Sequence, residues 1–188
     1  MKKLLLLALL FVGCAAVQSN NSGFLPDYAV LEPDPGDPDV ERWLSPDAGY
    51  YGQLMVPPFV AYFHENVRGR PIRANELDDL FTRLRSAVID ALDDEYLLAT
   101  ESGPGVLRLE IAVTDLHKQS DAFSGLGLRD ANVEMRGVDS QTDKVVFAAV
   151  YSRRLTRSTG DDKEAAVRAV VTDWVAHVRE EIDAAEAE

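Results

Sequence analysis

The sequence is short of cysteine, histidine and basic residues, and each shortage excludes a class of site. One cysteine in 188 residues leaves no partner for an intramolecular disulfide and no set of thiolates for a zinc site. The three histidines, His64, His117 and His177, share no spacing that would pair them as metal ligands. With 19 basic against 32 acidic residues, the formal net charge of −13 opposes binding to nucleic acid. We therefore expect no metal, no other cofactor and no nucleic-acid partner.

Motifs of the common nucleophilic and nucleotide-binding enzymes are missing as well. The chain holds no Gly-x-Ser-x-Gly turn, and Ser124–Gly127 is not followed by the Gly-Lys-Ser/Thr of a phosphate-binding loop. Asp115 and His117 follow a predicted strand on the same side of an extended chain, which is the nearest approach to a catalytic pair. We expect a protein that is not an enzyme, with a hydrolase-like activity at these two residues as an alternative.

The longest apolar run stands at the start of the chain and is too short to cross a bilayer. Lys2 and Lys3 precede the nine apolar residues Leu4–Val12. A transmembrane helix needs about 20 apolar residues. A positive start, a short apolar stretch and a small residue at its end are typical of a cleaved export signal.

This run ends in Phe11-Val12-Gly13-Cys14, which resembles the lipobox of bacterial lipoproteins. The resemblance implies cleavage before Cys14, a diacylglycerol on its thiol and an acylated amine. Several acyl chains anchor a protein firmly, since each buried methylene contributes about 0.8 kcal/mol. Ala15 stands where lipoproteins of the inner membrane commonly carry aspartate, so the resemblance favours the outer membrane, facing the periplasm. An ordinary secretory signal with an incidental cysteine is the alternative.

Composition divides the remaining chain in two. After removal of residues 1–13, the segment 14–49 is rich in proline and aspartate, a composition that removes backbone donors and resists collapse. It is predicted to form no regular element and to serve as a tether, with the apolar patches around Phe24–Leu25 and Trp43–Leu44 lying against the domain surface. Residues 50–188 are expected to form a single α+β domain.

Two kinds of periodicity define the elements of this domain. Apolar residues recur at intervals of three and four over Leu77–Leu92, which predicts an amphipathic helix with Asn75 as its N-cap. Residues 107–114 alternate apolar and polar, which predicts a strand with one wet face. Further strands are expected at Leu54–Tyr62, Tyr96–Thr100, Ala131–Asp139 and Val145–Leu155, and a second helix from Thr159 to Ile182.

The order strand, helix, four strands, helix predicts an α+β fold. One-sided helices and a one-sided sheet satisfy each other by packing face to face. We expect a two-layer sandwich: a mainly antiparallel sheet of about five strands, with both amphipathic helices on one face.

Several stretches resemble the bacterial lipoproteins grouped as domain of unknown function 3313. Ser22–Tyr28 is similar to the opening motif Ser-Gly-Phe-Leu-x-Asp-Tyr of that family, and Val106–Asp115 to its central strand. Val138–Lys144 resembles its Asp-Ser-x-Thr-Gly hairpin, with Asp143 in place of the glycine. The resemblance implies an envelope lipoprotein and transfers no catalytic residue, because the family has no agreed activity.

Two surfaces are candidates for binding a partner. The loop after the strand at 107–114 carries three apolar side chains, and the end of the last strand carries the one basic cluster of an acidic body. These residues are Phe123, Leu126 and Leu128, with Arg153, Arg154 and Arg157. We expect a lipid-anchored protein that binds another envelope protein or supports an assembly. The alternative is a lipoprotein that binds a small ligand or lipid between helices and sheet.

Overall fold

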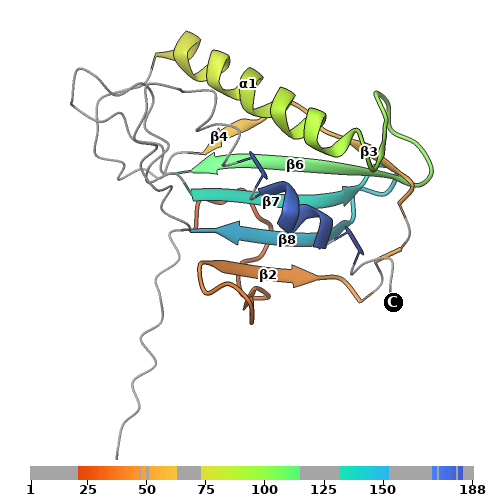
Figure 1. Cartoon of the computed structure of the whole chain (residues 1–188). Helices are drawn as coiled ribbons and strands as arrows, with labels where there is room; N and C mark the ends of the chain where they lie inside the picture. Colours follow the sequence, from red (N-terminus) through yellow and green to blue (C-terminus); the bar gives the residue numbers. More distant parts are fainter. Residues whose placement is uncertain are drawn as a thin grey trace, which may run out of the picture.

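The fold is α+β, one mixed sheet with two helices on one face, shown as a computed structural model in Figure 1. The structure describes residues 21–46, 48–49, 51–62, 73–114, 132–152, 171–172, 174–180 and 182–183. The sheet has eight strands, most of them antiparallel, where the sequence predicted about five. No helix among these residues is long and apolar enough to cross a membrane.

The sheet runs in the order β1-β2-β8-β7-β6-β3-β5, and β4 also pairs with β6. The neighbouring strands β1, β2, β8, β7 and β6 pair antiparallel. The short strands β3 and β4 pair parallel with β6, and β5 pairs parallel with β3. The apolar strand β8 lies inside the sheet, between β2 and β7. The strands are β1 Glu32–Pro33, β2 Val40–Leu44, β3 Gln53–Met55, β4 Val60–Tyr62, β5 Leu97–Leu98, β6 Val106–Thr114, β7 Asn132–Asp139 and β8 Val145–Tyr151.

The predicted strand Leu54–Tyr62 is two short strands. Its halves, β3 and β4, pair with opposite ends of β6. Pro57 and Pro58 lie between them, outside both strands. Proline cannot donate to a ladder, so the chain leaves the sheet at these residues and returns to it after them.

The helix α1 spans Ala74–Leu92, and its predicted apolar stripe is confirmed. Leu80, Leu84, Val88 and Leu92 are buried. The predicted N-cap at Asn75 is wrong, because the amide of Leu77 already donates to the carbonyl of Arg73 at 3.1 Å. The second helix is described at residues 171–172, 174–180 and 182–183, and its buried side chains are apolar, as expected of an amphipathic helix. They are Val171, Trp174, Val175, Val178 and Ile182.

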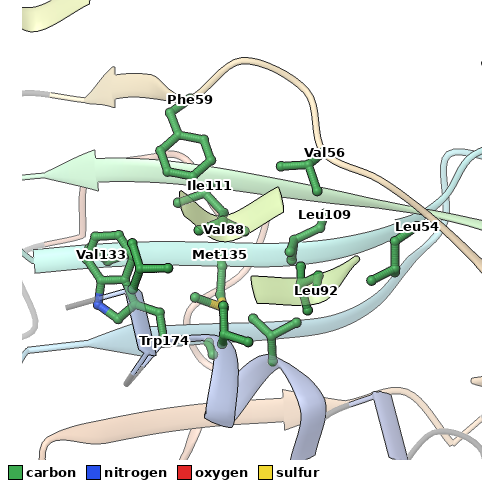
Figure 2. Packing of buried hydrophobic residues seen from close by; sticks show 14 of the residues in the cluster. Leu54, Val56, Phe59, Val88, Leu92, Leu109, Ile111, Val133, Met135 and Trp174 are labelled. Atoms are coloured by element: carbon green, nitrogen blue, oxygen red, sulfur yellow. The ribbon is translucent and has the colours of Figure 1, made fainter. Parts of the chain in front are cut away.

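The main core lies between these helices and one face of the sheet (Figure 2). Leu109, Met135 and Phe147, from three neighbouring strands, have no exposed area (0%), nor do Leu84 and Leu92 of α1. Leu109 and Phe147 lie in one row across the sheet, since both pair with Gly137, and Met135 lies in the next row, paired with Ile111 and Ala149. Both helices cover this face, as predicted.

The opposite face, called here the second face, is covered as well, which corrects the prediction of a wet face. Phe24 and Leu25 pack there against Ala112, Ala148 and Val150. In Figure 1 the N-terminal segment, in red and orange, passes behind the sheet. The predicted packing of Phe24–Leu25 against the domain is therefore confirmed, whereas Trp43–Leu44 belongs to the sheet itself, as part of β2.

The expectation that residues 14–49 form no regular element is wrong for β2. Val40–Leu44 pairs along its whole length with β8, and β1 extends the sheet beyond it. Val40–Leu44 forms a strand because its backbone hydrogen-bonds to β8, which lies about 100 residues later in the sequence. Local composition does not reveal such a distant partner.

In the β7–β8 hairpin, Asp143 stands where the family motif has glycine. This residue has φ 57°, the left-handed region that glycine adopts freely. Asp139 shapes the turn by accepting hydrogen bonds from the amides of Gln141 (3.0 Å) and Thr142 (2.8 Å). The hydrogen bond from the Thr142 amide, helped by the other bonds, holds the pKa of Asp139 below its ordinary value, although burial acts in the opposite direction.

Replacing Asp143 with glycine should therefore raise the free energy of unfolding by about 0.5 kcal/mol. Relief of a left-handed non-glycine residue contributes about 1 kcal/mol, and the exposed ion pair to Arg108 (2.9 Å) that is lost contributes up to about 0.5 kcal/mol. Urea unfolding measures the change. Asp143→Ala, which loses the pair and keeps the strain, should destabilise. If alanine proves as stable as glycine at this position, backbone strain is absent.

Candidate functional site

A cluster of charged side chains lies on the second face, under the N-terminal segment. Glu134 is 1% exposed. Arg136 follows it on the same face of β7, and Glu110 on β6 pairs with Arg136. A buried carboxylate costs several kcal/mol unless it is paired or hydrogen-bonded. The contacts of these groups therefore decide what the cluster does.

Ser22–Tyr28, here called the docking segment, binds Glu134 through two hydroxyl groups. The Tyr28 hydroxyl donates to Glu134 Oε2 at 2.6 Å, and Ser22 Oγ donates to the same oxygen at 2.9 Å. The Tyr28 hydroxyl also accepts from the amides of Gly23 (3.0 Å) and Leu25 (3.2 Å). Gly23 has φ 89°, so the turn requires glycine there. One phenol thus closes the segment on itself and attaches it to the sheet.

Burial, followed by the hydrogen bond to Glu134, raises the pKa of Tyr28 above its ordinary value. The neutral phenol is therefore the stable form, and it acts as a hydrogen-bond donor to a carboxylate. It is not poised to lose a proton as a general acid would be.

Arg136 holds the docking segment from a second point. Its Nη1 donates to the carbonyl of Phe24 at 2.9 Å, and its guanidinium lies 4.6 Å from the centre of the Phe24 ring. Its Nε donates to Glu110 Oε2 at 2.8 Å. Arg108 donates to the other oxygen of Glu110 at 2.6 Å. The two arginines therefore neutralise Glu110, and Arg136 also fixes the docking segment in place. This is a structural role.

A shallow groove of about 440 Å³ lies over the edge strands β1 and β2. Arg42, on its wall, pairs with Asp34 at 2.6 Å. Burial alone would raise the pKa of Asp34, but the amides of Gly36 and Asp37 lower it below its ordinary value. The lining combines apolar and charged residues and consists of Val30, Glu32, Pro33, Pro35, Arg42, Trp43 and Leu44.

Of the residues singled out in the sequence, His177 is described. It lies half-buried on the second helix, with its ring centre 5.1 Å from that of Tyr151 and its Nε2 3.8 Å from Asp37. In the described part of the chain, no group of three or more histidine, cysteine, aspartate or glutamate residues could hold a metal. The other candidates lie outside the described residues: Cys14, His64, Asp115, His117, Phe123, Leu126, Leu128, Arg153, Arg154 and Arg157.

Sequence reasoning missed Glu134 and Arg136. The alternation in Asn132–Asp139 predicts their strand, but a charged residue at every second position also fits a solvated face. One signal in the sequence could have indicated that this face is buried. The strand β8 is apolar on both faces, so other parts of the chain must pack against each of them.

Comparison with solved structures finds distant likenesses. A variant of PelC from Paraburkholderia phytofirmans, described as a dodecamer, is 16% identical with a TM-score of 0.46, over 76% of this chain and 95% of that one. A DUF4136 family protein from Bacteroides thetaiotaomicron is 9% identical with a TM-score of 0.45, over 76% of this chain and 96% of that one. Comparison with curated proteins finds no match.

The family described as "Protein of unknown function (DUF3313)" matches residues 20–177, a range that includes the docking segment, α1 and all eight strands. The chain belongs to this family.

Proposed function

We propose that this protein is a lipid-anchored protein of the bacterial cell envelope, attached through Cys14 and acting by binding another envelope protein. The observation that supports this most directly is the docking segment. Only eight residues after Cys14 the chain is bound to the sheet at Glu134. The described part of the chain nearest to the predicted anchor is thus built into the folded body.

Charge supports attachment through lipid alone. Without Lys2 and Lys3, the chain carries 17 basic and 32 acidic residues, a formal charge of −15. Such a body is repelled by anionic lipid headgroups. The acyl chains would hold it at the outer membrane, facing the periplasm, while its surface remains available to a partner.

The filled interior favours an external binding surface over an internal ligand. Among the described residues, the space between the helices and the sheet is occupied by large apolar side chains such as Leu92 and Phe147, both with 0% exposure. Partner binding through Phe123, Leu126 and Leu128, or through the arginines from Arg153 to Arg157, remains our proposal, as does the absence of catalysis.

Crosslinking in intact cells tests this function. The wild-type protein should yield one specific adduct with an envelope protein. Phe123→Ala or Arg153→Glu should lower its yield several-fold, because each removes an apolar or cationic contact. The yield is measured by quantitative mass spectrometry of the purified adduct. Arg83→Glu, on the exposed face of α1, makes the same charge change elsewhere and should leave the yield unchanged.

Cys14→Ser separates the anchor from the binding surface. It should move the protein from the membrane fraction to a soluble or uncleaved form, and the acyl mass should be lost. A membrane fraction unchanged by Cys14→Ser would contradict lipid anchoring. The lack of any specific adduct would contradict partner binding.

A further inference from the structure

The distance between anchor and body depends on where the chain first binds the sheet. Cys14 and Ser22 are eight residues apart. An extended chain covers at most about 3.5 Å per residue, so this stretch spans at most about 28 Å. Without the docking segment, the first strand would be β1 at Glu32, 18 residues after Cys14. The maximal span would then be roughly 60 Å, more than twofold longer.

The docking segment is held by few but specific contacts. The centre of the Phe24 ring lies 4.6 Å from the guanidinium of Arg136 and 5.6 Å from the centre of the Tyr62 ring, which it meets in a T-shaped contact. Leu25 is 4% exposed and adds apolar contact with the sheet. The Tyr28 hydroxyl joins the amides of Gly23 and Leu25 to Glu134, and Ser22 and Arg136 each add one further hydrogen bond. Removing the Tyr28 hydroxyl oxygen therefore weakens the attachment and leaves the main core untouched.

The side on which the segment docks also matters. Phe24 and Leu25 lie on the second face, whereas the helices cover the other face. The chain from the anchor therefore joins the body on the side away from α1.

We propose that the docking segment is a spacing device, which shortens the chain between lipid and body to eight residues and so holds the body close to the bilayer by its second face. This rests on the proposed lipidation of Cys14. A partner must then meet the body near the membrane surface.

Energy transfer in proteoliposomes tests the spacing. The acylated full-length protein carries Leu97→Cys, a substitution on the edge strand β5 at a side chain 72% exposed, for a donor dye. The bilayer contains lipids with an acceptor dye. Tyr28→Phe should lower transfer efficiency by about half, because the root-mean-square span of the released chain grows roughly 1.5-fold. The amides of Gly23 and Leu25 should exchange hydrogen at least tenfold faster.

Tyr62→Phe is the matched control, since it removes a phenolic hydroxyl from the ring beside Phe24 and should leave both readouts unchanged. Ser22→Ala, a milder change that removes one bond to Glu134, should give a smaller fall and covers the case in which Tyr28→Phe does not fold.

The outcomes separate the two proposals. Equal transfer in wild type and Tyr28→Phe, with Cys14 acylated, would overturn the spacing device and leave the anchor standing. Unchanged amide exchange would overturn it too. Protein without an acyl mass on Cys14 would refute the anchor as well as the spacing.

Discussion

Replacing Gly137 with alanine is expected to lower the free energy of unfolding by about 2–3 kcal/mol, through overpacking of the core. A Cβ at this position would overlap the Cε1 and Cδ1 atoms of Phe147 and lie 3.0 Å from Cζ. Phe147 pairs with Gly137 across the β7–β8 ladder and has 0% exposed area, so its ring has no free space to move into. Absence of a side chain here is thus a packing requirement of the central strands.

Urea unfolding of the purified protein measures this cost, and a second substitution tests its cause. Phe147→Leu alone should destabilise by about 1–2 kcal/mol through lost contact. If the ring is the obstacle, Gly137→Ala combined with Phe147→Leu should cost about 1 kcal/mol less than the sum of the two. Gly49→Ala, where nothing lies within 4 Å, is the control and should be neutral. Strict additivity would show that Phe147 is not what excludes a side chain.

The elements that the sequence predicts well are those that bury one face along a regular period. In α1, residues from Leu80 to Leu92 recur on one side, and in β6 the residues from Leu107 to Val113 alternate. Each pattern states locally which face is buried, so no knowledge of the partner element is needed. The helical layer and the central strands followed from these patterns alone.

The elements that the sequence missed depend on partners far along the chain. The strand β2, with the sequence VERWL, sits among proline and aspartate residues that predict a loop. It is a strand because β8 offers a free edge for Val40–Leu44. The parallel pairing of β3 and β4 is likewise set by β6, and their own residues do not distinguish it from antiparallel pairing.

The candidate site was hidden for a related reason. The motif Ser22–Tyr28 is visible in the sequence, but its hydroxyl groups find their acceptor more than 100 residues away, at Glu134 (Ser22 112, Tyr28 106). Charge in an alternating strand normally indicates solvent. The three-dimensional structure shows that these charges are covered, because Glu134 is 1% exposed and Phe24 packs against Arg136.

Replacing Glu134 with alanine should lower the free energy of unfolding by about 3 kcal/mol. Hydrogen bonds to a charged group contribute roughly 1.5–3 kcal/mol each, and two hydroxyl groups would lose their acceptor in a site shielded from water. Relief from burying the charge offsets part of this loss. Glu134→Gln keeps one acceptor oxygen in the same shape and should cost only about 1 kcal/mol. Urea unfolding compares the two.

A double-mutant cycle assigns the loss to the docking segment. If Glu134 acts through Tyr28, then Glu134→Gln and Tyr28→Phe together should cost about 1 kcal/mol less than their sum. Glu101→Ala, an exposed acidic change elsewhere, should stay within about 0.5 kcal/mol of wild type. Additive costs would mean that the carboxylate stabilises the sheet itself. Non-additive costs would show that the docking segment and β7 stabilise each other. The docking segment would then unfold together with the rest of the domain.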